Sequence, residues 1–186
     1  MKKKTVIKPS SFFIANAFIV LMLTISMYSF SQSPKASETP TLNTANEQKQ
    51  IAAMLDSFNR AAARADFNKY FSYYTEGAIF TGTDATERWD KRGLMAYAKP
   101  YFDKGHGWDF TSIERHIYFD KTGTLAWFDE LLNTQMKICR GSGVVVKQGN
   151  EWKVQQYILS TTIPNEKMDS VIKMKAPVED LIIKQH

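Results

Sequence analysis

The chain has only one cysteine and three histidines among its 186 residues. A single cysteine cannot form a disulfide within the chain, so the fold must be stabilised by its hydrophobic core. Because Cys139 lies in an apolar segment, we interpret it as a small buried side chain rather than a nucleophile. No H-x-H or H-E-x-x-H pattern joins the histidines, so the sequence predicts no metal site.

Several signatures of cofactor-dependent and hydrolytic enzymes are absent as well. The sequence contains no phosphate-binding loop, no dinucleotide fingerprint and no recognisable order of a Ser-His-Asp triad. The run Gly141-Ser142-Gly143 is too short for a phosphate loop and lies in an expected strand, where glycine relieves crowding at a bend. We therefore expect a protein that works without a cofactor.

Net positive charge is nearly absent beyond the N-terminal segment. The whole chain has 24 Lys and Arg against 19 Asp and Glu, but four of the lysines and none of the acidic residues lie in residues 1–31, which leaves 20 against 19. A nearly neutral remainder without a basic run excludes nucleic acid as a partner.

The first 31 residues have the pattern of a signal peptide. Four lysines precede an apolar run at 12–28, and the small-x-small exit Ser29-Phe30-Ser31 follows. An uncleaved membrane anchor is the alternative, because the run approaches the roughly 20 residues that span a bilayer. Asn16 and the small-residue exit favour cleavage, so we expect a bacterial protein that is periplasmic or secreted, with no stable membrane anchor.

The rest of the chain divides into a spacer, one domain and a tail. Residues 32–46 are rich in Ser, Thr, Pro and Asn, which is typical of a flexible spacer. The expected domain covers residues 47–164, and residues 165–186 form the tail. Apolar spacing predicts a first helix from Glu47 to about residue 64. The next predicted elements are a helix that Asp66 caps and Gly77 ends, a strand at 78–81 and a helix over Lys91–Phe102 that Asp90 caps.

Four apolar-alternating segments follow at 108–119, 124–135, 138–147 and 152–162. Tight-turn residues join them, as in an antiparallel meander of β-hairpins. Beyond Pro164, Asn165 is expected to cap a last helix that Pro177 interrupts. This tail either packs against the domain or a partner subunit, or it is a frayed terminus.

Four short sequence motifs occur in this order along the predicted helices and strands. They are Gly-Thr-Asp-x-x-Glu-x-Trp at 82–89, Ala-Trp-Phe-Asp-Glu at 126–130, Arg-Gly-Ser-Gly-Val-Val at 140–145 and Trp-Lys-Val at 152–154. Over about residues 47–164 the chain resembles the SnoaL-like branch of the nuclear transport factor 2-like superfamily. The resemblance implies an α+β fold, a cone-shaped cystatin-like roll with three N-terminal helices packed on a bent, mostly antiparallel sheet. It also implies a pocket inside the cone and a homodimer through the outer face of the sheet.

The resemblance does not choose a reaction. The superfamily contains isomerases, cyclases, dehydratases, hydrolases and non-catalytic binders. Several members carry a histidine six residues after the tryptophan of the last strand, but this chain has Ile158 there, so their His-centred mechanism does not carry over.

Two neighbouring carboxylates are the strongest candidates for catalysis. Asp129 and Glu130 point to opposite faces of their expected strand, and the sequence leaves open which one points inward. A buried carboxylate needs a cation or becomes protonated, and Arg140 on the next strand is the nearest expected partner. This group can act as a general base or acid with its orienting cation, or it can be a structural ion pair.

Other residues are candidates for ligand binding, and the full set is Asp84, Glu87, Arg88, Trp89, Tyr97, Tyr101, Trp127, Gln156 and Ser160. The residues at 84–89 lie where the fold would place the rim of the pocket, as a lid or as local packing and pairing. Alternation along the last strand places Gln156 and Ser160 in its apolar wall, where they contact either a ligand or a core neighbour. His116 shares a strand face with Glu114, as an acid–base pair or, more commonly, a surface ladder.

We therefore expect an exported domain that binds a small, partly apolar organic molecule. An enzyme of this kind would transfer protons without a cofactor, as in isomerisation, cyclisation or hydrolysis. The alternative is a non-catalytic periplasmic module for ligand binding or assembly.

Overall fold

The computed structural model describes residues 44–185. The predicted signal peptide and most of the predicted spacer lie outside the described residues. Within 44–185, no helix is both long and apolar enough to cross a bilayer.

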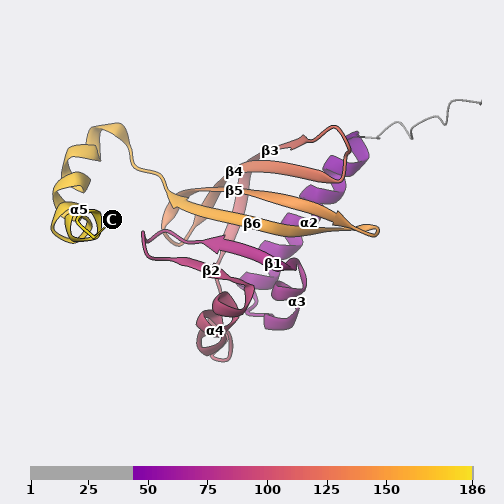
Figure 1. Cartoon of the computed structure of the whole chain (residues 1–186), viewed down its shortest axis with the longest axis horizontal. Coiled ribbons are helices and arrows are strands. Elements are labelled where there is room, and N and C mark those ends of the chain that lie inside the picture. The colour runs from indigo at the N-terminus through magenta and orange to yellow at the C-terminus, as the bar shows by residue number, and fades with distance from the viewer. Residues whose placement is uncertain (1–43, 186) are drawn as a thin grey trace, which may run out of the picture. The chain divides into compact units, whose positions relative to one another are not determined.

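The described chain is an α+β fold with one mixed six-stranded sheet (Figure 1). Its elements are α2 (Thr44–Ala63), α3 (Phe67–Ser72), β1 (Tyr74–Thr81), β2 (Arg88–Asp90), α4 (Lys91–Phe102), β3 (Phe110–Phe119), β4 (Leu125–Thr134), β5 (Lys137–Gln148), β6 (Glu151–Thr161), a 3-10 turn (Asn165–Lys167) and α5 (Met168–Ile183). The strand order is β2-β1-β6-β5-β4-β3, and only the β1–β6 pair is parallel. In Figure 1, α2 crosses behind the sheet, whose near face carries none of the helices α2 to α4.

Two of the three predicted helix caps are confirmed, whereas Asn165 lies within the 3-10 turn before α5 and α5 has no side-chain cap. The Asp66 carboxylate accepts a hydrogen bond from the Lys69 N–H (3.0 Å) and begins α3. The Asp90 carboxylate accepts one from the Gly93 N–H (2.7 Å), and α4 has the predicted bounds. An N-cap of this kind satisfies a backbone donor that the first helical turn leaves without a partner.

The structure differs from the prediction at three places. The second helix ends at Ser72 rather than Gly77, because the chain already enters β1 at Tyr74 and pairs there with β6. The three-residue strand β2 was missed, since a segment this short shows no alternation. Pro177 does not interrupt the last helix, because one missing N–H removes only one hydrogen bond from a helix of 16 residues.

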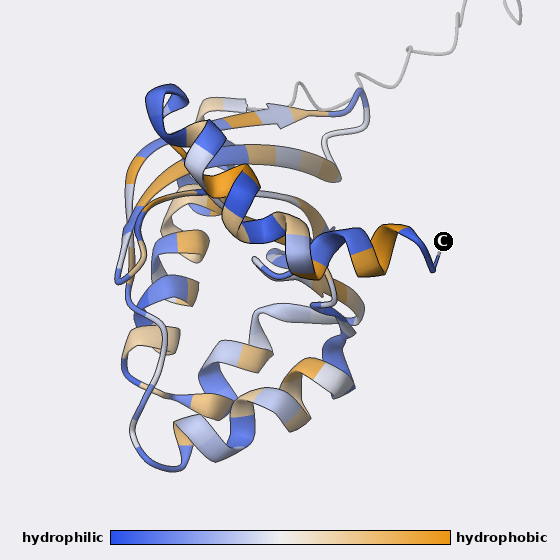
Figure 2. Cartoon of the chain, turned by 90° about the vertical axis from the view of Figure 1, so that its left-hand side faces the viewer, coloured by the Kyte–Doolittle hydropathy of each residue, from blue (hydrophilic) through white to orange (hydrophobic). Residues whose placement is uncertain are grey.

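Helix α5 does not join the core of the domain, because none of its residues is buried. Figure 2 shows hydrophobic bands along it up to the C-terminal end. Its packing against a partner subunit stays a prediction.

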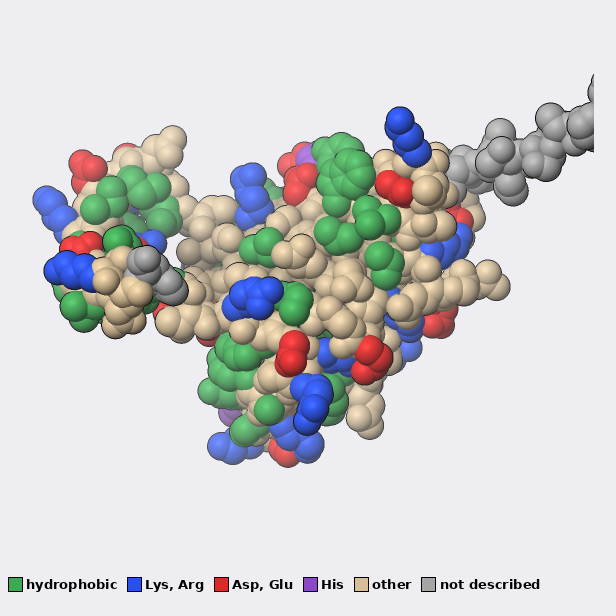
Figure 3. Space-filling view, in the orientation of Figure 1, with side chains coloured by type: hydrophobic (Ala, Val, Ile, Leu, Met, Phe, Trp, Pro, Cys, Tyr) green, Lys and Arg blue, Asp and Glu red, His purple; other side chains and the backbone are tan. Residues whose placement is uncertain are grey.

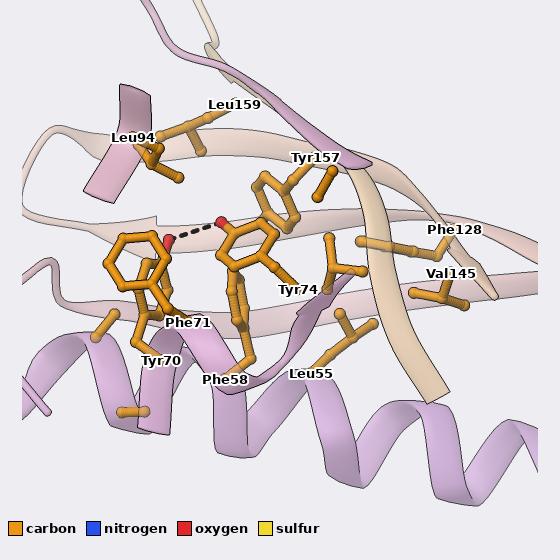
Figure 4. Close-up of a cluster of buried hydrophobic side chains, with 14 of the residues drawn as sticks. Leu55, Phe58, Tyr70, Phe71, Tyr74, Leu94, Phe128, Val145, Tyr157 and Leu159 are labelled. Carbon is orange, nitrogen blue, oxygen red and sulfur yellow. Dashed lines mark hydrogen bonds between the residues drawn. The ribbon is translucent and has the colours of Figure 1, made fainter. Parts of the chain in front are cut away.

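Aromatic side chains hold α2 and α3 against the sheet (Figure 4). The ring of Phe58 on α2 stacks on Tyr70 of α3 at a centroid distance of 4.7 Å and meets Tyr74 edge-on at 5.2 Å. The hydroxyls of Tyr70 and Tyr74 share a buried hydrogen bond of 2.9 Å, the dashed line in Figure 4. Because each buried hydroxyl has a partner, the core keeps the aromatic area without leaving an unpaired polar group here.

A β-bulge in β6 changes which side chains face the core. Val144 pairs with Gln156 but Val145 pairs with Val154, so Gln155 is an extra residue. Trp152 and Val154 are buried before the bulge, and Tyr157 and Leu159 are buried after it. The alternation therefore shifts by one position at Gln155.

Candidate ligand-binding site

A cavity of about 180 Å³ lies between β1, β2, α4, the end of β6 and the β4–β5 turn. Its lining residues are Tyr70, Phe80, Gly82, Thr83, Glu87, Trp89, Leu94, Tyr97, Trp108, Phe110, Gln135, Met136 and Leu159. Six of these side chains are aromatic. An apolar concave surface with a few polar groups is the usual composition of a small-molecule site.

The turn from Gly82 to Glu87 folds one carboxylate back onto the cavity. The Glu87 N–H donates to the Asp84 carbonyl (3.0 Å), and the Asp84 N–H donates to Glu87 Oε2 (3.2 Å). A Cβ atom at Gly82 would overlap the Glu87 carboxylate, so only glycine leaves room for this arrangement. The sequence 82–87 thus builds a defined turn that positions Glu87.

Stacked aromatic rings form one wall of the cavity. Trp89 lies between Tyr97, at a centroid distance of 4.7 Å, and Phe80, at 6.2 Å, and both pairs are close to parallel. The pKa of Tyr97 is raised, first by burial and then by the neighbouring Tyr101 and the charge of Glu87. The Tyr97 hydroxyl is therefore protonated at neutral pH and can donate a hydrogen bond to a ligand.

Tyr70 lines the cavity from the buried side, and its hydroxyl shares a hydrogen bond with Tyr74 (2.9 Å). Burial raises its pKa, and the pKa of its partner Tyr74 is raised for the same reason. Both phenols remain neutral, because a charged phenolate in this apolar surrounding would lose its hydration.

Only part of the predicted ligand-binding set lines the cavity. Glu87, Trp89 and Tyr97 do so, whereas Asp84, Arg88 and Tyr101 lie close to them in the chain without lining it. The carboxylate of Asp84 is instead engaged by the N–H and hydroxyl of Thr86 (2.9 and 2.6 Å), which lower its pKa.

Sequence reasoning missed most of the remaining wall. Phe80, Trp108 and Phe110 carried only an aromatic signal, which is equally typical of a core residue. Nothing in the sequence indicated Gln135 and Met136, because the position of the β4–β5 turn over the cavity depends on how the strands bend.

Glu130 is the inward carboxylate, and its partner is Arg115 rather than the predicted Arg140. The Arg115 Nε donates to Glu130 Oε2 (2.8 Å), while Nη2 lies 2.8 Å from the same oxygen without the alignment of a hydrogen bond. The Tyr157 hydroxyl donates to Glu130 Oε1 (2.8 Å). Arg115 stands directly opposite Glu130 in the β3–β4 register, whereas Arg140 is paired with Leu131 and is exposed.

Room for this buried group comes from the strand glycines. A Cβ atom at Gly141 would overlap the Tyr157 hydroxyl and approach Glu130 Cγ to 3.0 Å. A Cβ atom at Gly143 would likewise meet the Phe128 ring at 2.9 Å. These two glycines relieve crowding, as the sequence indicated. Neither Glu130 nor Arg115 lines the aromatic cavity.

Asp129 lies on the opposite face of the sheet, with His116. His116 Nδ1 is 3.2 Å from Asp129 Oδ1, and His116 Nε2 is 3.1 Å from Glu114 Oε1. Together with Glu130, Leu131 and Arg140, these side chains line a second cavity of about 180 Å³. All three residues predicted for catalysis, Asp129, Glu130 and Arg140, therefore border this second cavity, and none of them lines the aromatic cavity. Their roles in catalysis stay predictions.

The pKa of His116 is expected to depend on its two carboxylate neighbours, Asp129 and Glu114. The hydrogen bond with Asp129 is the largest cause that raises its pKa, and the charges of Asp129 and Glu114 add to it. Asp129→Asn should therefore lower the pKa of His116 toward its ordinary value near 6.5, and Glu114→Gln should lower it less. An NMR titration of the imidazole in both variants checks this order.

The same interaction has a defined pH dependence. Because the folded pKa of His116 is raised, its stabilising contribution is complete below about pH 6.5 and is lost as the pH rises through the folded pKa. A pKa of His116 that both variants leave unchanged would contradict the contacts described.

Gln156, Ser160 and Trp127 also fall on the outer face. The prediction that Gln156 and Ser160 face the inside was wrong about direction, because it assumed unbroken alternation across the bulge at Gln155. Trp127 is 45% exposed and stacks on Tyr118 at a centroid distance of 5.8 Å. A role of these three residues in ligand binding stays a prediction, away from the aromatic cavity.

No group of three or more His, Cys, Asp and Glu side chains in residues 44–185 is arranged to hold a metal ion. The aromatic cavity itself offers one carboxylate, Glu87, and no His or Cys.

Comparisons with known proteins agree on the fold. The sequence profile of the SnoaL-like domain matches residues 51–164. No curated protein matches the chain. Among solved structures, an NTF2-like protein of unknown function from Pseudomonas putida KT2440 is 16% identical, with a TM-score of 0.55 over 67% of this chain and 92% of that one.

Two further solved structures carry provisional enzyme names. A provisionally named scytalone dehydratase from Novosphingobium aromaticivorans DSM 12444 is 13% identical, with a TM-score of 0.56 over 64% of this chain and 87% of that one. A provisionally named dehydratase of the NTF2-like family from Streptomyces avermitilis is also 13% identical, with a TM-score of 0.55 over 65% and 99%.

At these identities the likeness to solved structures shows the fold alone, and it confirms the predicted α+β class. The family rests on the profile match, which covers more than half of the chain. The chain belongs to the SnoaL-like domain family and has an NTF2-like fold.

Proposed function

We propose that the chain binds a small, partly apolar organic molecule in the aromatic cavity. The observation that carries this proposal is a cavity of about 180 Å³ lined by six aromatic side chains and few polar ones. Its volume is slightly larger than the roughly 150 Å³ cavity that holds one benzene molecule in an engineered protein. A ligand group of about the size of one ring fits this space.

The walls support binding because they are fixed before a ligand arrives. Trp89 is held by stacking on both sides, and Glu87 is held by the 82–87 turn. Side chains that are already ordered lose little entropy when a ligand binds.

Native mass spectrometry of the protein purified from its own host tests this proposal. Met136 borders the cavity and is 38% exposed, so Met136→Trp should fill the mouth without disturbing the core. Met174 on α5 is 72% exposed and does not line the cavity, which makes Met174→Trp a matched control. We expect the wild type and the control to retain a defined small mass that Met136→Trp loses. Equal retention in all three proteins, or a mass in none of them, would contradict the proposal.

A second candidate function is proton transfer at the same site. It is supported by the Glu87 carboxylate on the cavity wall, near the Tyr97 hydroxyl, and by similar structures that carry dehydratase names. Glu87 would act as the base and a tyrosine hydroxyl would stabilise developing charge on oxygen. Incubating the retained ligand with the protein in D₂O tests this: wild type should incorporate deuterium, and Glu87→Gln should not.

We also propose that the protein is exported. The four lysines, the apolar run and the small-residue exit within residues 1–31 support this proposal. N-terminal sequencing of the protein from the periplasmic fraction should begin near residue 32. A chain that keeps residues 1–31 in the membrane fraction would instead favour the anchor.

A homodimer through the outer sheet face is a further proposal. Figure 3 shows hydrophobic side chains gathered over β3 and β4, and Tyr118 and Trp127 there are each 45% exposed. A patch of this kind on an exposed sheet face is typical of a self-complementary interface. Sedimentation should show that Trp127→Lys is a monomer, whereas Tyr101→Lys, at an equally exposed aromatic on α4, leaves the wild-type state unchanged.

A further inference from the structure

We propose that the ligand of the aromatic cavity carries a positively charged ammonium group, with quaternary ammonium as the best-fitting class. This inference rests on the proposed binding function and adds the chemical class of the ligand. It is carried by the combination of an aromatic wall, one carboxylate and the absence of cationic lining residues.

The charges around the cavity favour a cation. Among the described residues that line it, Glu87 is the only acidic one, and no Lys or Arg lines it. The charged residues nearest to Glu87 along the chain are Arg88, which does not line the cavity, and Asp84 and Asp90, which are acidic. An anionic ligand would therefore meet repulsion from Glu87 without any compensating cation.

Glu87 has no cationic partner within the described part of the chain. By contrast, Glu76 pairs with Lys91 (2.7 Å), and Asp103 pairs with Lys99 (2.5 Å). The Glu87 side chain instead accepts a hydrogen bond at Oε2 from the Asp84 N–H. A half-buried carboxylate beside aromatic rings loses hydration, and a ligand ammonium would compensate for that loss.

The aromatic rings provide the second half of the recognition. The faces of tryptophan, tyrosine and phenylalanine attract a cation within about 6 Å, and several rings around one point form the cage that binds quaternary ammonium groups. Six such rings line the cavity. Trp89, Tyr97 and Phe80 stack on one another and so cover part of their own faces, and Tyr70, Trp108 and Phe110 complete the lining. Trp108 is in ring contact with the buried Tyr70 at a centroid distance of 6.0 Å, so these two rings of the lining hold each other in place.

The size of the cavity sets the size of the charged group. A volume of about 180 Å³ accepts a trimethylammonium head group but not a large polycyclic molecule. Because Met136 and Tyr97 on the lining are each 38% exposed, a substituent on the head group can extend toward solvent. The remainder of the ligand is thus less restricted than its cationic end.

A matched pair of probes separates charge from shape. Choline and 3,3-dimethylbutan-1-ol have the same shape, with nitrogen in one replaced by carbon in the other. Tryptophan fluorescence of the full mature protein reports binding, since Trp89 and Trp108 line the cavity. We expect choline to bind at least about tenfold more tightly than the alcohol, with affinity that falls as salt rises.

Two variants test the role of the carboxylate. Glu87→Gln keeps an oxygen for the Asp84 N–H but removes the charge, so choline affinity should fall about tenfold while affinity for the alcohol is unchanged. Asp84→Asn is the matched control, because it removes a charge from the same turn without changing the lining. It should leave both affinities within twofold.

The outcomes distinguish this inference from the binding function itself. Equal affinity for choline and the alcohol, or no effect of Glu87→Gln on choline, would overturn the cationic class while leaving an apolar binding site. No binding of choline together with a neutral retained mass in native spectra would overturn it in the same way. Failure of Met136→Trp to release the retained mass would instead contradict the proposed site.

Discussion

Arg115→Met is expected to lower the free energy of unfolding by about 3–5 kcal/mol, because it leaves the buried Glu130 without its cation. Glu130 has no exposed side-chain area, and Arg115 is 9% exposed. Arg115 also links β3 to α2, since its Nη1 donates to the Asp56 carboxylate (2.9 Å) and to the Ala52 carbonyl (3.1 Å). Its removal therefore weakens the contact between sheet and helix as well.

Denaturation in urea at neutral pH measures this effect. Lys99→Met is the matched control, because it removes the cation of an exposed pair with Asp103, and it should change the free energy of unfolding by less than about 1 kcal/mol. The double variant Arg115→Met/Glu130→Leu removes both buried charges and should recover most of the loss. Its remaining deficit would report two losses: the acceptor of the Tyr157 hydroxyl, and the bonds of Arg115 Nη1 to α2.

The same series decides between the two interpretations of the inward carboxylate. A structural ion pair predicts large losses in the single variants and recovery in the double variant. Stability within 1 kcal/mol of wild type in Arg115→Met would show that the pair does not hold the fold, and would return Glu130 to the candidates for chemistry. Burial, and next the charge of Glu130, raises the pKa of Tyr157, so this hydroxyl remains a donor in the wild type.

The sequence predicted those elements whose signals are local. The three helices and the four long strands were all expected, and α4 has the predicted bounds because Asp90 and the apolar spacing after it act within one turn. The hairpin turns of the meander are equally local, since Gly123 and Gly149 both adopt positive φ there.

Features set by pairing between distant segments were harder to predict. The parallel pairing of β1 with β6 joins residues about 80 positions apart, and it fixes the early start of β1 at Tyr74. The partner of Glu130 depends on the register between β3 and β4, which places Arg115 opposite Glu130, although Arg140 is closer along the chain. No local sequence pattern predicts either of these strand registers.

In the candidate site, too, residues placed by local signals were predicted and those placed by long-range strand pairing were not. Glu87, Trp89 and Tyr97 were found because a short turn and the first turns of one helix place them together. Gln156 and Ser160 were assigned to the wrong face because one extra residue reverses the direction of every side chain after it. A bulge has no reliable sequence signal, so this error follows from the geometry of strands.

Deleting Gln155 and deleting Lys153, which precedes the bulge, are expected to have very different effects on stability. Without Gln155, Val145 still pairs with Val154 and Val144 with Gln156, so the ladder becomes regular and the buried set is unchanged. The deletion removes two hydrogen bonds, from the Thr75 hydroxyl to Gln155 Oε1 (2.9 Å) and from Gln155 Nε2 to the Gly77 carbonyl (3.0 Å). Its cost should be about 1–3 kcal/mol.

Deleting Lys153 instead reverses the direction of Trp152. Trp152 is 3% exposed and donates its indole N–H to Glu47 at the start of α2 (2.7 Å), so both its packing and this bond are lost. We expect a loss of about 3–5 kcal/mol, as when a buried tryptophan is truncated. Urea denaturation of the two deletion variants gives the comparison, with Lys153→Ala as the control for the lost side chain. If β6 alternated without a bulge, the two deletions would be equally harmful. Equal losses of unfolding free energy would therefore show that Gln155 is not the extra residue of a bulge. A smaller loss for the Gln155 deletion would place the shift in alternation at Gln155.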